Sequence, residues 1–275
     1  IQNTQEHIII RNCQLYDGGY RYFNYFNPGS LFLFNCANIT IIDCEIDYIE
    51  AEDSTDLKIS DIYWQADNRT VIYIDTCMDV IIEDLGNCSI TMRYSGSSVI
   101  ENCTVNDMNS RIYIYSGPWY YGHIVVKNCT IKNTVGDAFP EGLLLRDSYY
   151  THLYDNVFVN SFPKVETYGY EGFFRTVSIP PNNTVNGKSI QAVIGKDLQW
   201  EDVPGGGGYY LFLQSKNISV KNVVLAKDSI GFSIQSCSGV SLDGISVPGE
   251  TMMGMYFFQT DGISINGSIF HNMTD

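Results

Sequence analysis

Short segments in which apolar and polar residues alternate recur along this chain with the same design. An alternating run of mostly β-branched residues leads into Asn or Asp, then cysteine, then a polar residue and an aliphatic one. Period-two alternation is typical of β-strands with one buried face, and Asn or Asp tolerates the left-handed backbone of a sharp bend. Four copies are IIIRNCQL (Ile8–Leu15), ITIIDCEI (Ile39–Ile46), SVIENCTV (Ser98–Val105) and HIVVKNCTI (His123–Ile131).

A second column of Asn, Asp or Gly lies six residues before the cysteine position and follows another apolar strand. It recurs after 22 residues between Asn217 and Gly239, and after 23 residues between Gly239 and Gly262. One such repeat cannot bury its apolar face alone, so the repeats must stack. The pattern predicts an all-β fold, a right-handed parallel β-helix (solenoid) with loop insertions. A sandwich or barrel would not repeat its bend residues at this period.

The repeats favour a single parallel β-helix domain over residues 1–275, interrupted by insertions at 47–70 and 160–210. Excursions from a solenoid usually form loops over one face. The first insertion carries an acidic run whose hard oxygen ligands could bind a structural calcium ion. The alternative interpretation is that these charges are simply solvated. No other cofactor is expected. The acidic residues are Glu50, Glu52, Asp53 and Asp56.

The charge balance excludes some partners. The chain has 31 acidic and 16 basic residues, for a net charge of −15. Nucleic acids and anionic membrane surfaces attract basic patches, so neither is expected as a partner. No apolar run reaches the roughly 20 residues of a membrane-spanning helix, and no membrane insertion is expected. Nine N-glycosylation sequons are typical of an exported glycoprotein.

Three elements of the sequence resemble a known family. They are the rungs of the form NITIxxCxI, the NTVNGK segment (Asn183–Lys188), and the strand pair YYLFLQSKNISVKNVVL (Tyr209–Leu225). They resemble the NosD-like parallel β-helix proteins, which include many archaeal cell-envelope proteins and the carbohydrate-binding and sugar-hydrolysis repeats. The resemblance implies the fold over most of the chain and an extracellular or cell-surface location.

The family name is associated with copper delivery, but the sequence offers no soft copper site. The seven methionines are scattered, and the four histidines lack the spacing of a ligand cluster. Copper binding is therefore not expected of this chain.

The eight cysteines fall mostly into two columns that follow or precede the bends. Stacked in this way they can act as small buried hydrophobic groups, or they can form cross-links within or between subunits. Parallel side chains in register have poor disulfide geometry. Cys88 lies outside both columns and is the best candidate for an intermolecular bond. The columns are Cys13, Cys44, Cys103 and Cys129, and Cys36, Cys77 and Cys237.

Several sequons coincide with the bend columns and have a structural explanation. Asn38, Asn102, Asn128 and Asn217 occupy bend positions, where stacked asparagines can hydrogen-bond along the axis. The better glycosylation candidates lie off the columns: Asn68, Asn182 and Asn272.

Aromatic residues cluster between the predicted strands. Exposed Tyr and Trp can anchor a protein interface, stack on sugars, or cover the flank of the solenoid. The candidate interface residues are Tyr20, Tyr22, Tyr25, Trp119, Tyr120, Tyr121, Tyr149 and Tyr150.

The sequence shows no catalytic constellation. Polysaccharide enzymes require paired carboxylates with a nearby His, Arg or Lys. The string TDGISI (Thr260–Ile265) is similar to part of a polygalacturonase motif, but no Asp-Asp pair or Gly-His-Gly accompanies it. No catalytic residue is assigned and no enzyme activity is expected, with a polysaccharide hydrolase or lyase as the alternative.

The repeat is in phase by Ile8 and still in phase at Ile269, without an evident cap. Exposed strand edges pair with other chains. The sequence therefore favours a structural cell-envelope protein that self-assembles into a homopolymer, such as a sheath, surface-layer (S-layer) or filament subunit of an archaeal envelope. The alternative is a carbohydrate-binding or polysaccharide-processing β-helix, with glycans as partners. A sugar-binding protein should carry aligned carboxylates and aromatics along one open flank.

Overall fold

A computed structural model of the chain is all-β in the part that it describes. Every regular element there is a strand, and the described residues hold no helix long and apolar enough to cross a membrane. The predicted all-β class is confirmed. The described residues are 1–15, 30–63, 70–106, 110–116, 122–132, 141–148, 150–166, 177–196, 205–225, 229–249, 251 and 253–271.

Sheet A is a parallel sheet to which each repeat adds one strand. Matching repeat positions pair in register, as Ile49 does with Ile72 and Ile72 with Ile90. Its strands in spatial order are β3 (Leu31–Phe34), β5 (Tyr48–Glu52), β7 (Thr70–Asp75), β9 (Cys88–Arg93), β12 (Ile112–Tyr115), β15 (Glu141–Arg146) and β18 (Phe162–Glu166).

Sheet B is the parallel sheet that the chain enters after each strand of sheet A. Its residues also pair in register, as Ile59 does with Ile82. The strands are β1 (Ile8–Arg11), β4 (Ala37–Ile46), β6 (Thr55–Tyr63), β8 (Met78–Glu83), β10 (Ser98–Glu101), β13 (Ile124–Lys127) and β16 (Thr151–Tyr154), with β2 (Gln14–Leu15) also paired to β4.

Sheet C extends from one half of the molecule into the other. Its neighbouring strands are parallel except β19 and β20, which pair antiparallel around a two-residue turn. Asn186 and Gly187 in this turn have φ of 48° and 77°, as in a type I′ hairpin. The strand direction in sheet C reverses here. The strands are β11 (Thr104–Val105), β14 (Thr130–Lys132), β17 (Val157–Val159), β19 (Thr184–Val185), β20 (Lys188–Ile194), β21 (Tyr209–Leu213), β23 (Gly231–Gln235) and β26 (Gly254–Phe258).

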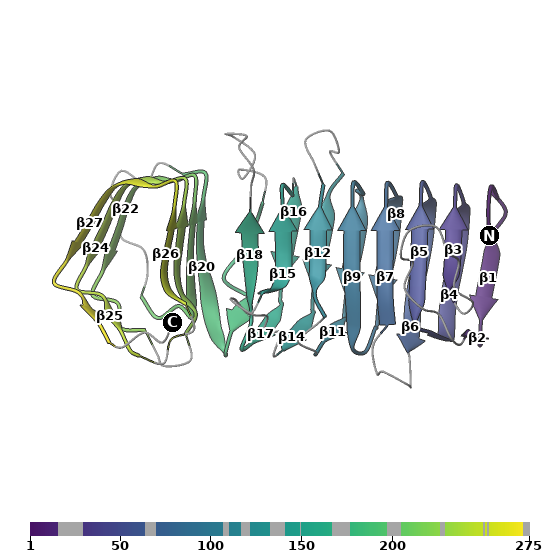
Figure 1. Cartoon of the computed structure of the whole chain (residues 1–275), viewed down its shortest axis with the longest axis horizontal. Coiled ribbons are helices and arrows are strands. Elements are labelled where there is room, and N and C mark those ends of the chain that lie inside the picture. The colour runs from purple at the N-terminus through teal and green to yellow at the C-terminus, as the bar shows by residue number, and fades with distance from the viewer. Residues whose placement is uncertain are drawn as a thin grey trace.

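The reversal divides the chain into two stacks of rungs, a rung being one pass through the sheets. Residues 8–185 form the N-terminal stack and residues 188–270 the C-terminal stack. In Figure 1 the rungs of the N-terminal stack follow one another along the long axis, whereas those of the C-terminal stack appear nearly end-on as nested outlines. The C-terminal stack adds a three-stranded sheet of β22 (Lys216–Lys221), β24 (Ser238–Asp243) and β27 (Asp261–Asn266), and a pair of β25 (Ser246–Val247) and β28 (Ile269–Phe270).

The bend residues expected from the sequence adopt a left-handed backbone. Asn38, Asn102, Asn128 and Asn217 have φ between 54° and 58°. This conformation is rare for most residues, but Asn and Asp tolerate it. The structural interpretation of these four sequons is therefore confirmed.

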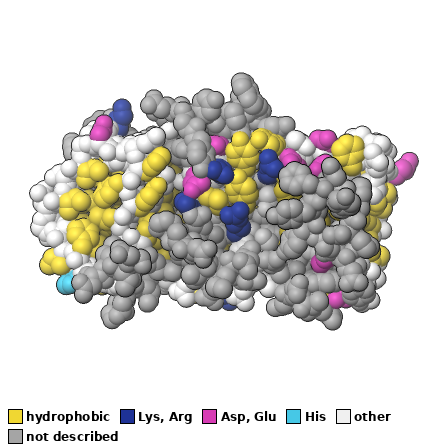
Figure 2. All heavy atoms as spheres, viewed as in Figure 1, with side chains coloured by type: hydrophobic (Ala, Val, Ile, Leu, Met, Phe, Trp, Pro, Cys, Tyr) yellow, Lys and Arg dark blue, Asp and Glu magenta, His cyan; other side chains and the backbone are white. Residues whose placement is uncertain are grey.

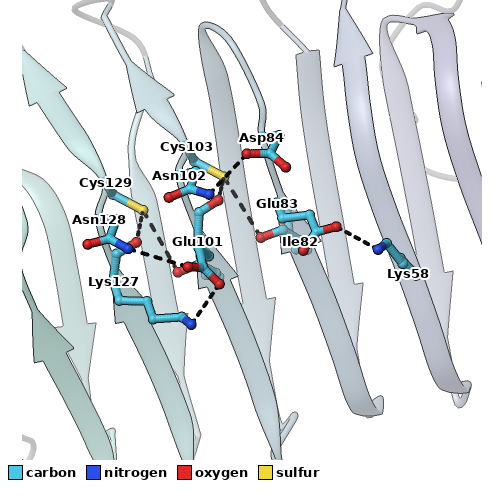
Figure 3. Close-up of polar contacts among 11 residues, drawn as sticks. Lys58, Ile82, Glu83, Asp84, Glu101, Asn102, Cys103, Lys127, Asn128 and Cys129 are labelled. Atoms are coloured by element: carbon cyan, nitrogen blue, oxygen red, sulfur yellow. Dashed lines mark hydrogen bonds and ion pairs between the residues drawn. The ribbon is translucent and has the colours of Figure 1, made fainter.

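Polar side chains at the end of sheet B connect each rung to the next (Figure 3). Asn102 Nδ2 donates to Asp84 Oδ1 at 3.0 Å, and Asn128 Nδ2 donates to Glu101 Oε1 at 3.3 Å. Lys127 Nζ lies 2.7 Å from Glu101 Oε2. Partly exposed pairs of this kind contribute about 1 kcal/mol or less each. They help to fix the register between rungs, while the core supplies most of the stability.

Each stack encloses its own apolar core. Aliphatic residues such as Ile59 and Ile82 fill the N-terminal core and are fully buried. The C-terminal core is also mostly aliphatic, and it adds the rings of Tyr210 and Phe232, stacked at 4.7 Å beside Phe212. The apolar core expected from the inward-facing aliphatic residues is present, but it is divided between the two stacks.

Strand β21 belongs to both cores. Tyr209, Leu211 and Leu213 pack into the N-terminal core, whereas Tyr210 and Phe212 pack into the C-terminal core. All five side chains are buried. The outer face of sheet C therefore closes one end of the N-terminal stack.

The expected insertions need correction. Segment 47–70 contains β5 and β6, which pair in register within sheets A and B. The prediction of an insertion there is wrong, because Glu50 and Glu52 occupy outward positions of an ordinary rung. Segment 160–210 contributes β18, β19 and β20 to sheets A and C, while 167–176 and 197–204 lie outside the described residues. Two stacks joined by a turn replace the expected single repeat.

Candidate binding surface and pocket

The outer face of sheet A carries two rows of mainly aromatic and charged side chains. Every second residue of a strand points away from the core, and in-register pairing stacks these residues at roughly 4.8 Å per rung. We call the two rows the sheet A strip. One row is Phe32, Glu50, Tyr73, Thr91, Tyr113, Leu144 and Lys164, and the other is Phe34, Glu52, Asp75, Arg93, Tyr115, Arg146 and Glu166.

Tyrosine hydroxyls are paired with carboxylates in the first part of the strip. Tyr48 OH donates to Glu50 Oε2 and Tyr73 OH donates to Asp75 Oδ2, each at 3.1 Å. Arg93 Nη1 donates to Tyr73 OH at 2.8 Å. These contacts hold the polar atoms in place on strands, which position side chains better than loops do.

Arginine and tyrosine side chains pack together in the middle of the strip. The rings of Tyr94 and Tyr115 meet edge to face at 4.9 Å, and Arg93 lies 5.4 Å from the Tyr94 ring. Arg111 lies 5.2 Å from the ring of Tyr113. The hydrogen bond with Tyr94 raises the pKa of Tyr115 to about 12. The phenol of Tyr115 is therefore a neutral hydrogen-bonding group at neutral pH.

Cations gather toward the β18 end of the strip. Lys164 Nζ lies 2.7 Å from Glu166 Oε1, and Arg146 Nε lies 3.9 Å from Glu166 Oε2. On the face shown in Figure 2, Lys and Arg side chains group near the middle of the molecule, with acidic side chains beside them. This end of the strip thus offers donors and acceptors close together.

A pocket lies where the strip reaches sheet C. Strand β18 is the edge strand of sheet A, and sheet C of the C-terminal stack lies beside it (Figure 1). The pocket is a hollow of about 330 Å³ that opens to solvent. We call it the corner pocket. Its lining residues are Phe162, Lys164, Tyr209, Ser233, Gln235, Met253 and Tyr256.

One row of residues across sheet C explains where the pocket begins. Ala192 and Leu211 are apolar and pack on the N-terminal core. Ser233 and Tyr256 continue the same row on β23 and β26 and line the pocket. The row becomes polar and aromatic where sheet C extends past the core that it covers.

The pocket combines ring faces with a buried amide. The rings of Phe162 and Tyr209 lie 5.3 Å apart, and both side chains are almost fully buried. Gln235 is 6% exposed, and its Nε2 donates to Ser233 Oγ at 3.0 Å. Within the described part of the chain, the carbonyl oxygen of Gln235 accepts no hydrogen bond.

The predicted interface aromatics fall mostly where the structure gives no description. Tyr150 is half-buried, with its ring 5.1 Å from that of His123, away from the sheet A strip. The others lie outside the described residues: Tyr20, Tyr22, Tyr25, Trp119, Tyr120, Tyr121 and Tyr149.

Of the glycosylation candidates, Asn68 and Asn272 lie outside the described residues. Asn182 is exposed, and its Nδ2 donates to Asp155 Oδ1 at 2.9 Å. This is the same contact that Asn102 makes with Asp84. Asn182 thus continues the ladder of bend side chains, and its glycosylation stays a prediction.

The cysteines are free thiols, and all but Cys13 are buried. Burial raises the pKa of Cys77 to about 12 and that of Cys237 to about 11. These thiols are protonated at neutral pH and pack as small apolar groups, which confirms that interpretation. Cys88 is fully buried and interacts with Cys103. The prediction of an intermolecular disulfide bond through Cys88 is wrong, because the buried Cys88 thiol is out of reach of another chain.

The acidic run does not converge on one point. Glu50 accepts from Tyr48, and Asp53 Oδ1 accepts from Thr76 Oγ1 at 2.6 Å. Among the residues that the structure describes, no three His, Cys, Asp or Glu side chains are grouped to hold a metal ion. The calcium site therefore stays a prediction without a gathered ligand set.

The comparison with protein families identifies the group to which this fold belongs. Residues 35–200 match the family model described as "Periplasmic copper-binding protein (NosD)". The chain belongs to the NosD family. The resemblance seen in the rungs and in the NTVNGK segment is confirmed, and NosD membership is consistent with a location in the cell envelope. Comparison with curated proteins gave no match, and comparison with solved structures gave none.

The NosD description mentions copper, but the described side chains do not fit a copper site. His123 Nδ1 and His152 Nε2 lie 3.3 Å apart, and these two rings are stacked on each other. Among the residues that the structure describes, no third His, Cys, Asp or Glu side chain joins this pair to form a metal site. We therefore derive no copper chemistry from these residues.

Proposed function

We propose that this NosD-family chain is a right-handed parallel β-helix of the cell exterior whose sheet A strip binds saccharide chains. The in-register parallel sheets support the β-helix, and parallel strand crossovers are almost always right-handed. Envelope proteins of this kind meet the polysaccharides of the cell surface. The function is therefore recognition of a surface glycan.

The single observation that carries the proposal is the order of the strip. Tyrosine rings, carboxylates and guanidinium groups recur from rung to rung along one outer face. A sugar ring has an apolar face that packs on tyrosine and a rim of hydroxyls that bond to charged groups. A linear polymer of such rings can contact several rungs at once, and each contact adds to the affinity.

We propose binding without cleavage. Glycosidases require two carboxylates facing each other across the scissile bond, roughly 5–10 Å apart. In the strip the carboxylates already have partners on their own rung: Glu50 has Tyr48, Asp75 has Tyr73, and Glu166 has Lys164. Glu50 is only 5% exposed, so Asp75 and Glu166 are the carboxylates that act as fixed acceptors for sugar hydroxyls.

Affinity electrophoresis in gels containing xylan, glucomannan or polygalacturonate tests the proposal. Migration of the protein should be retarded by at least one polymer. Tyr113→Ala and Arg93→Ala should each weaken retardation about tenfold, the loss expected for an interface anchor. Tyr154→Ala, on the outer face of sheet B and 37% exposed, is the matched control and should bind as the wild type does. No retardation by any polymer, or equal loss in the control, would contradict the proposal.

A second candidate is a self-associating subunit of a sheath or surface layer. Exposed apolar side chains on the outer face of sheet B favour it. Ile9 is 60% exposed and Ile81 40% exposed, and both lie in one row with Val99, separated from each other by Thr40 and Lys58. Exposed apolar side chains with polar neighbours can mark contact surfaces between proteins.

Negative-stain imaging and sedimentation at high concentration test the second candidate. Ordered polymers are expected, and Ile81→Lys should disperse them because a charge would be buried at the contact. A wild-type protein that stays monomeric at the highest soluble concentration would eliminate it.

A further inference from the structure

We infer that the corner pocket binds the terminal sugar residue of a saccharide chain, so that the protein recognises chain ends as well as chain interiors. The inference rests on the proposed function of the sheet A strip. It concerns a separate set of residues, contributed mainly by sheet C of the C-terminal stack.

The arrangement of the two stacks places this pocket at the end of the strip. Strand β18 carries the last members of both rows, Lys164 and Glu166. Next to it lie β21, β23 and β26, which contribute Tyr209, Gln235 and Tyr256 to the pocket. A chain that follows the strip toward β18 meets these strands and cannot continue in the same direction. Its end, rather than its middle, therefore occupies the pocket.

The lining suits a neutral sugar ring. Phe162 and Tyr209 are packed together at the base of the pocket, and half-buried Tyr256 adds a second phenol ring. The carbonyl oxygen of Gln235 can accept a bond from a hydroxyl, and Lys164 can donate to one. The hollow of about 330 Å³ includes space that is open to solvent, so a bound ring would lie partly exposed. This space is adequate for one ring.

The buried amide argues against a purely structural cavity. Gln235 is 6% exposed, while its row neighbours Leu213 and Ile194 on β21 and β20 are apolar. An apolar residue would also fill this position if packing were its only role. A hydroxyl-bearing ligand accounts for the amide, because the carbonyl oxygen of Gln235, which lines the pocket, can accept a bond from it.

The test compares long polymers with their short fragments. Xylan, glucomannan and polygalacturonate, and the hexasaccharide of each, are titrated against the intact protein by calorimetry. Hexasaccharides carry many more ends per unit mass, so a pocket for ends should favour them. Gln235→Leu and Tyr256→Ala should weaken hexasaccharide binding at least about tenfold and change long-polymer binding by less than about twofold.

Gln191→Leu is the matched control. Gln191 Nε2 donates to Ser189 Oγ at 2.9 Å, the same local pair that Gln235 forms with Ser233, but it does not line the pocket. This variant should bind hexasaccharides normally. Circular dichroism checks that each variant is folded. If Gln235→Leu does not fold, Tyr256→Ala still tests the pocket, because Tyr256 is only half-buried.

The outcomes separate the two proposals. If the long polymers bind and the pocket variants leave hexasaccharide binding unchanged, the pocket assignment is wrong and the strip stands. If the pocket variants weaken polymer and hexasaccharide equally, the pocket does not distinguish ends and the inference is also wrong. If wild-type protein binds neither, the function of the strip and the inference both fail.

Discussion

The two stacks share one rung design but use different residues at the bends. In the N-terminal stack, Asn and Asp occupy many bends and bond to the next rung, as Asn102 does to Asp84. In the C-terminal stack, glycines occupy several bends, and backbones from neighbouring rungs come close together. A Cβ atom added to Gly231 would lie 2.1 Å from the carbonyl oxygen of Gly254. Side chains connect many rungs of the first stack, which also has one close backbone approach, between Gly96 and Gly122. The second stack uses glycine at more of its bends.

The two cores are more alike than the bends. Aliphatic residues line both, and the C-terminal core adds a cluster of three rings, Tyr210, Phe212 and Phe232. Asn and Asp bends can change residue with little effect on the backbone, because their contribution is one hydrogen bond. Glycines packed against a neighbouring backbone, such as Gly231, cannot, because a side chain has no space there. We therefore expect substitutions at bends to have unequal effects in the two stacks.

The largest expected effect is that of Gly231→Ala. Its φ of 119° disfavours any side chain, and the new Cβ would collide with backbone that cannot move aside. The unfolding free energy should fall by about 4 kcal/mol or more, or the C-terminal stack should fail to fold. Near-ultraviolet circular dichroism of the aromatic core and urea unfolding measure this loss.

Gly86→Ala is the control for this substitution. Gly86 lies in the N-terminal stack with no positive φ, and nothing lies within 4 Å of an added Cβ. Its stability should be unchanged or slightly higher. A stable Gly231→Ala protein with an intact aromatic signal would remove the basis for the comparison.

The next effect concerns the joint between the stacks. Asn183 is fully buried; its Oδ1 accepts from Asn156 Nδ2 at 2.9 Å, and its Nδ2 donates to Leu153 O at 3.0 Å. Asn183→Leu should cost about 2–4 kcal/mol, since several buried polar groups lose their partners. The adjacent exposed Asn182→Ala removes the bond to Asp155 and a longer bond of 3.4 Å from Asn183 Nδ2, and should cost about 0.5–1 kcal/mol. Equal losses in denaturant unfolding would contradict this account of the joint.

The bend columns and the parallel sheets were predictable, because they depend on local backbone preference and alternation. The bends at Asn38 and Asn102 follow from residue type alone. The acidic run was misread as an insertion because Glu50 and Glu52 do not look like strand residues until their outward direction is known. The division into two stacks was also missed. The Asn186–Gly187 turn is a recognisable hairpin signal, but nothing local shows that it reverses a sheet.

The candidate site was the least predictable part. Members of the strip such as Tyr73, Thr91 and Tyr113 are separated by 18 to 22 positions in the chain and come together only through the register of sheet A. Aligning the strands that precede the first bend and reading their outward positions could have found them. The corner pocket could not be found in this way, since Lys164 and Tyr256 meet only because the two stacks run in different directions.

A smaller effect is expected when the bend residues are exchanged between stacks. Asp84→Gly keeps the left-handed bend and loses only the bond from Asn102, so it should cost about 1 kcal/mol or less. The reverse change, Gly244→Asp, places a Cβ 2.8 Å from Asn222 Oδ1 and should cost more. Urea unfolding of both variants measures the asymmetry. A larger loss for Asp84→Gly would show that side-chain ladders matter more than backbone packing.

The smallest expected effect is a pH dependence confined to the N-terminal stack. Burial, and then the charge of His123, lower the pKa of His152 from its usual value of 6.5. The unfolded chain takes up this proton at a higher pH than the folded chain does. The associated stability is therefore present above about pH 6.5 and is lost as the pH falls through the lowered folded-state pKa.

Unfolding measured from about pH 7 down to about pH 5 should show this decline, and His152→Gln should remove that part of it. Hydrogen exchange should localise the change to β13, which His123 immediately precedes, and to β16, which carries His152. A decline of the same size in the C-terminal stack would show that other groups are responsible.

Because each rung adds one strand to sheet A, the number of rungs sets the length of glycan that the strip can contact. Duplicating or deleting one whole rung in the middle of the N-terminal stack would lengthen or shorten the strip by roughly 4.8 Å and leave the corner unchanged. Length and terminus recognition can therefore vary independently in evolution. Shared ancestry with longer or shorter relatives need not imply a different end specificity.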